Sequence, residues 1–125
     1  MKIRCIFATS LFLAVLLGCA STDGRRSYRA GKQDAKSDVS KGILAIEELG
    51  WPPPSEHEYT QLLDRQYSIT VRRVGYCVVS EQTDEHARGY NKVAEAEIER
   101  RFGKKVLEKA VEQAQKSYEA KKELH

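Results

Sequence analysis

Two short clusters place carboxylates beside imidazoles, the residue types that ligate metals and exchange protons. They are residues 56–58, Glu-His-Glu, and residues 84–86, Asp-Glu-His. Neighbouring residues on a helix point in different directions, and neither cluster repeats its ligands at i and i+4. The chain also shows no nucleophile motif, glycine-rich phosphate loop or paired-carboxylate spacing. We therefore predict a protein that is not an enzyme, with no catalytic residue, no metal ligand and no cofactor.

Cysteine is the other residue type with reactive chemistry, and the chain has three. One of them ends the stretch Leu16-Leu17-Gly18-Cys19, which closes an apolar run that follows two basic residues. The run is shorter than the roughly 20 apolar residues that span a bilayer comfortably. A basic start, a short apolar run and a small residue before the cleavage point are typical of a signal peptide.

The same stretch resembles the lipobox of a bacterial lipoprotein precursor. In that family the cysteine receives a diacylglycerol thioether, signal peptidase II cuts on its amino side, and the new terminus is acylated. The resemblance covers residues 1–19 only, and it departs from the family pattern at Leu17, where a smaller residue is more usual. It implies that residues 1–18 are removed, that Leu16, Leu17 and Gly18 are recognised by the peptidase, and that Cys19 is lipidated. The alternatives are a plain signal peptide with an incidental cysteine and an uncleaved membrane anchor.

The residue after the cysteine governs sorting in bacteria with two membranes. The family's inner-membrane retention signal is usually an aspartate at that position, where this chain has Ala20. The resemblance therefore implies an outer-membrane location on the periplasmic side, with the membrane bound through lipid on Cys19. Because each buried methylene contributes about 0.8 kcal/mol, several acyl chains would make release negligible.

The 106 residues after Cys19 are enough for one small domain. Cleavage removes two basic residues and no acidic one, so the net charge falls from +3 to +1. That balance gives no basic footprint for nucleic acid, which we exclude as a partner. We expect a polar tether over residues 19–27, with Arg25 and Arg26 either near lipid headgroups or simply solvated. A single domain over residues 28–125 follows, and its C-terminal end frays.

Apolar residues spaced three and four apart predict four helices. They cover residues 28–49, 56–66 and 81–102, and a last stretch from about residue 104. In the first, Gly31, Ala35 and Gly42 would let another backbone approach closely, although its polar early half could instead bind a partner. The second begins with Ser55 and Glu58, which have the spacing of a capping box.

Residues 67–79 are rich in β-branched and aromatic side chains, which favours a strand. The alternation changes phase across Arg72 and Arg73, so the stretch is either a hairpin or one strand with a bulge. A single strand would need a backbone partner from another protomer or another protein. The predicted class is α+β, predominantly α, with about four helices and one short strand or hairpin in the middle.

Trp51 and Tyr76 are the candidate partner-binding residues, since tryptophan is enriched in binding hot spots. Trp51 could instead fold back over the core. Cys77, between apolar neighbours, is predicted to be buried and inert, and the alternative is an intermolecular disulfide. We predict a non-catalytic interaction or structural module that binds an envelope protein or forms a homodimer through the central strand. The alternative is a small-ligand or metal-binding protein, or a small periplasmic enzyme, with a site near Trp51, Tyr76 and His86.

Overall fold

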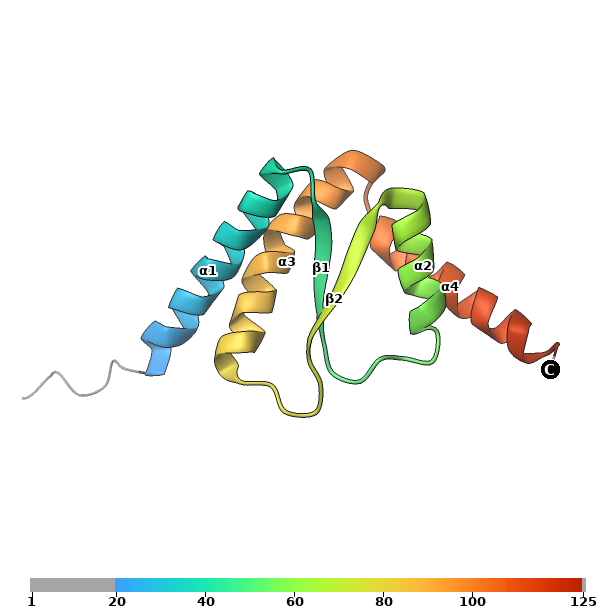
Figure 1. Ribbon diagram of the computed structural model, residues 1–125, viewed down its shortest axis with the longest axis horizontal. Coiled ribbons are helices and arrows are strands. Elements are labelled where there is room, and N and C mark those ends of the chain that lie inside the picture. The colour runs from blue at the N-terminus through green and yellow to red at the C-terminus, as the bar shows by residue number, and fades with distance from the viewer. Residues whose placement is uncertain (1–19, 125) are drawn as a thin grey trace, which may run out of the picture.

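The computed structural model describes residues 20–124, so the predicted recognition and lipidation residues Leu16, Leu17, Gly18 and Cys19 lie outside the described part of the chain. Residues 20–124 form four helices and two strands. In order these are α1 (Ala20–Ser40), β1 (Leu44–Leu49), α2 (Glu56–Tyr67), β2 (Ile69–Gly75), α3 (Glu81–Phe102) and α4 (Val106–Lys122). Helix α1 packs on α3, and α2 packs on α4, with the strands between the two pairs (Figure 1). The predicted class, a predominantly helical α+β fold, is confirmed.

The two strands pair in parallel, starting with Leu44 opposite Ile69. The register shifts after Glu48, so that Leu49 lies opposite Gly75 and one residue of β2 is left as a bulge. Of the two predicted arrangements, the single strand with a bulge is therefore confirmed and the hairpin is wrong. The partner strand, β1, comes from the same chain, whereas we predicted one from another protomer or another protein.

The first predicted helix is wrong at both ends. Helix α1 begins at Ala20 and so includes residues 20–27 of the predicted tether. It ends at Ser40, and residues 44–49 are strand β1. Gly42 has a φ of 79°, a left-handed conformation that glycine adopts without strain and that often ends helices. Gly42 therefore turns the chain into β1 and does not pack against a second helix.

Helices α1 and α3 approach closely because glycines face each other's backbones. A Cβ on Gly31 would overlap the backbone carbonyl oxygen of His86, and a Cβ on Gly89 would overlap that of Tyr28. Ala35, one turn further along α1, is completely buried. The close approach predicted for Gly31 and Ala35 is thus confirmed, and α3 is the helix that makes it.

Helix α2 buries Tyr59 and Leu63, as its apolar spacing predicts. The predicted capping box is wrong, because the side chain of Ser55 makes no capping hydrogen bond and is itself buried. Helix α3 occupies the predicted residues, and the Ser80 hydroxyl accepts a hydrogen bond from the backbone N–H of Thr83. The apolar spacing therefore predicts the positions of α2 and α3 correctly, although the predicted cap at Ser55 is not formed.

The outer edge of β1 is closed by a side chain of α3. The backbone N–H of Glu47 donates to Oδ1 of Asn91 over 2.9 Å, and Nδ2 of Asn91 donates to the carbonyl oxygen of Glu47 over 2.7 Å. Asn91 thus takes the place of a third strand at this position. The outer edge of β2 has no strand partner within residues 20–124. Its pairing with a second copy of the chain stays a prediction.

Candidate functional site

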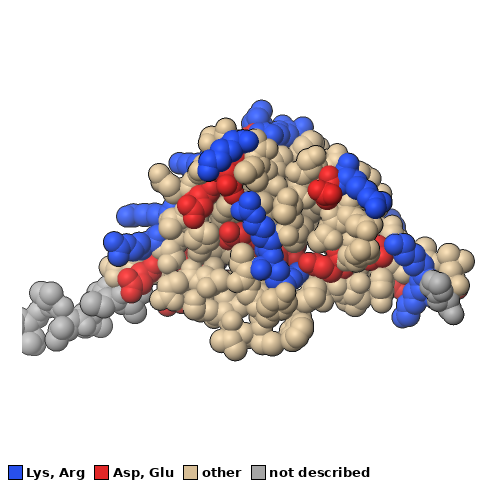
Figure 2. All heavy atoms as spheres, viewed as in Figure 1, with Lys and Arg blue, Asp and Glu red and all other residues tan. Residues whose placement is uncertain are grey.

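The loops that follow the two strands form an exposed surface without charged residues. Because β1 and β2 are parallel, residues 50–54 and 76–79 emerge at the same end of the sheet (Figure 1). We call these two segments the aromatic tip. Figure 2 shows an uncharged surface along the lower side, where these loops lie in Figure 1.

The tip brings together the two predicted binding residues. Trp51 is 72% exposed and Tyr76 is 55% exposed, and their ring centroids lie 5.9 Å apart in an edge-on arrangement. Trp51 therefore does not fold back over the core. The predicted burial of Cys77 is wrong: β2 ends at Gly75, so Cys77 lies in the loop beyond it and is exposed. Val78 beside it is 91% exposed.

The extent of this surface was missed at the sequence level, although a signal was present. Residues 49–55 and 74–80 contain no charged residue, in a chain of which 31% is charged. Two such runs in a polar domain indicate either buried segments or an apolar surface. Only the parallel pairing of the strands shows that the two runs meet.

Arg73 ties the tip to the strands. Its Nη1 donates to the carbonyl oxygen of Gly50 over 2.7 Å, and its Nη2 donates to carboxylate oxygens of Glu48 and Glu56 over 2.8 and 2.6 Å. The Arg73 side chain is only 11% exposed. Burial raises the pKa of Glu48 and the charge of Glu56 raises it further, while Arg73 opposes both effects. This largely buried guanidinium therefore joins the start of residues 50–54 to β1 and α2, and the backbone N–H of Gly50 also donates to the carbonyl oxygen of Gly75.

His86 belongs to a different cluster, between α1, β1 and α3. Its Nδ1 lies 3.0 Å from Oε2 of Glu47, and its Nε2 lies 3.0 Å from Oδ2 of Asp34. Burial lowers the pKa of His86, but the hydrogen bonds to Asp34 and Glu47 outweigh burial and leave that pKa above its ordinary value. Both ring nitrogens are engaged by carboxylates, so in this arrangement neither faces a substrate. The structure places His86 outside the tip.

A second polar cluster lies along the same helices. The Tyr90 hydroxyl donates to Oδ2 of Asp38 over 2.7 Å, and Nη1 of Arg72 donates to the same oxygen over 2.8 Å. These two hydrogen bonds lower the pKa of Asp38, while burial raises the pKa of Tyr90. Because the three groups bond to one another, the cluster joins α1, β2 and α3 and presents no free reactive group.

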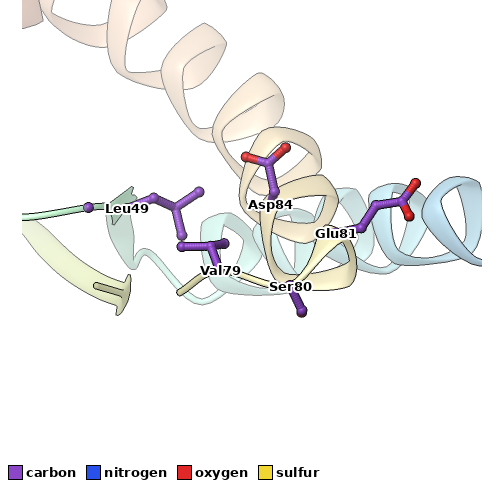
Figure 3. Close-up of a pocket in the computed structure, with 6 residues that line it drawn as sticks. Leu49, Val79, Ser80, Glu81 and Asp84 are labelled. Atoms are coloured by element: carbon purple, nitrogen blue, oxygen red, sulfur yellow. The ribbon is translucent and has the colours of Figure 1, made fainter. Parts of the chain in front are cut away.

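An open hollow lies beside the tip, between the end of β1 and the start of α3 (Figure 3). It is lined by Leu49, Gly50, Val79, Ser80, Glu81 and Asp84. The side chains of Leu49 and Val79 lie next to each other, whereas the carboxylates of Glu81 and Asp84 point in different directions. The described part of the chain contains no group of three or more His, Cys, Asp or Glu placed to hold a metal. The hollow thus has an apolar side, formed by Leu49 and Val79, and an acidic side whose carboxylates do not converge.

No known family matches this chain. Comparison with protein-family models, with curated proteins and with solved structures finds no match in any of the three. Among residues 20–124, no helix is long and apolar enough to cross a membrane.

The His86 cluster predicts that stability falls as the pH rises. The pKa of His86 in the folded protein lies above its ordinary value of 6.5, which an unfolded chain would show. Its contribution is therefore complete below pH 6.5 and is lost as the pH rises through the folded-state pKa. We expect the urea midpoint of the wild type to fall between pH 6 and pH 8.5, and His86→Gln to remove this fall. His57→Gln is the matched control on exposed α2 surface and should retain it; an unchanged pH dependence in His86→Gln would contradict the assignment.

Proposed function

We propose that this protein is a lipid-anchored module of the bacterial envelope, held through Cys19 on the periplasmic side of the outer membrane. Its mature domain binds a partner and does not catalyse a reaction. The aromatic tip carries this proposal, because it is an exposed, uncharged surface, whereas Arg73, His86 and Tyr90 are engaged in hydrogen bonds within the domain. The lipobox resemblance of residues 16–19 supplies the anchor.

The composition of the tip supports binding. Soluble domains rarely expose large contiguous apolar patches, and where they do the patch often marks an interaction site. Aromatic side chains supply large contact area, and Trp and Tyr are among the residues that contribute most to binding. Trp51 and Tyr76 also pack against each other and are braced by Arg73 through Gly50, so the surface is ordered before a partner arrives.

Substituting Cys19 with serine tests the anchor. We expect Cys19→Ser to abolish incorporation of labelled fatty acid and to leave the protein at its precursor mass, because the thioether on Cys19 precedes cleavage. Cys77→Ser is the matched control: it removes the exposed thiol of the tip and should retain both the label and the mature mass. If Cys19→Ser still gave a fatty-acid-labelled protein of mature mass in the membrane fraction, the proposal would fail.

A further inference from the structure

The aromatic tip lies at the same end of the domain as the start of α1. Gly24 packs against Glu81 and Glu85 in the first turns of α3, so the N-terminal ends of the two helices lie side by side (Figure 1). Helix α3 begins at Glu81, and only Ser80 separates it from residues 76–79 of the tip. Ala20 is four residues from Gly24, about 6 Å along the helix axis. Ala20, the residue that would follow a lipidated Cys19, is therefore close to the tip.

No flexible linker separates the anchor position from the domain. An extended segment over residues 20–27 would let the domain sit some 25 to 30 Å from the membrane. Those residues are instead the first two turns of α1. Gly24 and Gly31 of that helix pack closely against α3. Lipid on Cys19 would consequently hold this end of the domain against the bilayer.

The tip has the chemistry of a membrane-interface contact. Trp and Tyr concentrate at the headgroup level of bilayers, because their rings combine an apolar body with one polar atom. The tip brings no charged side chain that would have to be dehydrated. Residues 52–54 are prolines without a backbone N–H, so fewer donors would lose their hydrogen bonds to water. Val78 extends into solvent with 91% of its surface exposed.

Both basic and acidic residues flank the same end. Arg25, Arg26 and Arg29 are exposed on the first turns of α1, and Figure 2 shows basic side chains gathered over that helix. Basic residues close to a membrane surface are attracted to anionic lipid headgroups. Carboxylates of Asp23, Glu81 and Asp84 lie in the first turns of the same two helices, so this end is not uniformly basic. The uncharged tip and its closeness to Ala20, and not the charge around them, therefore favour a bilayer over a protein partner.

We propose that the partner of the aromatic tip is the lipid bilayer itself, so that the domain is held by lipid on Cys19 and by insertion of Trp51, Tyr76 and Val78 into the interface. This inference rests on the proposed function, because the anchor decides which end faces the membrane. The domain would then have a fixed orientation. The end of α3 and the start of α4, which lie away from the tip, would point into the periplasm (Figure 1).

Trp51 is the only tryptophan in the chain and reports on the tip directly. The protein is purified from the envelope in detergent and reconstituted into vesicles of phosphatidylethanolamine and phosphatidylglycerol, with or without bromine on the acyl chains. We expect brominated lipid to quench about half of the Trp51 emission, because an interfacial side chain lies about 5–10 Å into the headgroup and acyl boundary. Val78→Glu, at an exposed position that the fold does not need, should reduce the quenching.

The matched control moves the fluorophore to the other end of α3. In the double variant Trp51→Phe and Phe102→Trp, the tip keeps an aromatic residue and the new indole lies at the end of α3 remote from the tip. Brominated lipid should leave its emission unchanged. If the wild-type protein floats with the vesicles while Trp51 is not quenched, the tip inference is overturned and the anchor stands. If the protein does not float with the vesicles, the anchor fails and the inference fails with it.

Discussion

Replacing Gly31 with alanine is expected to lower the free energy of unfolding by about 3 kcal/mol or more, the upper end of the cost of overpacking a core. The new Cβ would overlap the backbone carbonyl oxygen of His86 and come within 2.9 Å of the backbone nitrogen of Tyr90. Because both obstacles are backbone atoms of α3, no rotamer change relieves them, and α1 has to move away. Gly89→Ala should have a similar effect through the carbonyl oxygen of Tyr28.

Gly24→Ala is the matched control within the same helix. There the nearest atom to the new Cβ would be Oε1 of Glu81 at 3.2 Å, the far end of a flexible side chain. Alanine also has the better helix propensity, by about 1 kcal/mol. We therefore expect the stability of Gly24→Ala to stay within about 1 kcal/mol of the wild type in urea unfolding. Equal stabilities of Gly31→Ala and Gly24→Ala would show that the two helices do not meet as described.

The second large effect is expected from Arg73→Met. It removes three hydrogen bonds and leaves the carboxylates of Glu48 and Glu56 close together without their shared cation. Removing one member of a buried ionic cluster typically costs about 3–5 kcal/mol. We expect a loss near the lower end of that range in urea unfolding, because Glu48 and Glu56 retain some contact with water. Residues 50–54 of the tip should also become more mobile, because the carbonyl oxygen of Gly50 loses its hydrogen bond from Arg73.

Arg100→Met provides the comparison on the surface. Arg100 pairs with Glu97 on α3, and its side chain is 69% exposed. Exposed ion pairs contribute about 0–1 kcal/mol, so this variant should unfold close to the wild type. A double variant, Arg73→Met with Glu56→Gln, should recover part of the loss because one of the two facing charges is gone. No recovery in the double variant would count against a charge-based role for Arg73.

The helices that depend on local signals could be predicted from the sequence. Helices α2 and α3 begin where a polar residue precedes a periodic apolar pattern, and Gly103 ends α3 with a φ of 98°. These features act over a few residues, so spacing alone reveals them. Gly31 could also be assigned to a close helix contact, because glycine within an apolar stripe is otherwise unfavourable in a helix.

Strand β1 could not be predicted in the same way. Its sequence, Leu-Ala-Ile-Glu-Glu-Leu, consists mainly of good helix formers and continues the spacing of the helix before it. It becomes a strand because Gly42 turns the chain and because β2 supplies a partner about 25 residues later. Non-local pairing thus overrides local propensity here.

Only part of the candidate site could be predicted from the sequence, because its arrangement also depends on non-local strand pairing. Trp51 and Tyr76 could be selected by residue type, but their meeting depends on the parallel strands that precede them. Cys77 was misplaced because its neighbours Tyr76 and Val78 suggest burial, whereas they lie in an exposed loop. The start of α1 was missed because its contact with α3 uses Gly24, which adds nothing to an apolar pattern.

If this domain is fastened to a membrane through Cys19, the mass of its N-terminal peptide must show the modification. The protein is purified from the envelope, digested and analysed by mass spectrometry. We expect a mature chain that begins at Cys19 and carries a diacylglycerol thioether and an amide-linked acyl chain. A chain that begins elsewhere with an unmodified Cys19, or one that retains Met1 and the preceding residues, would contradict it.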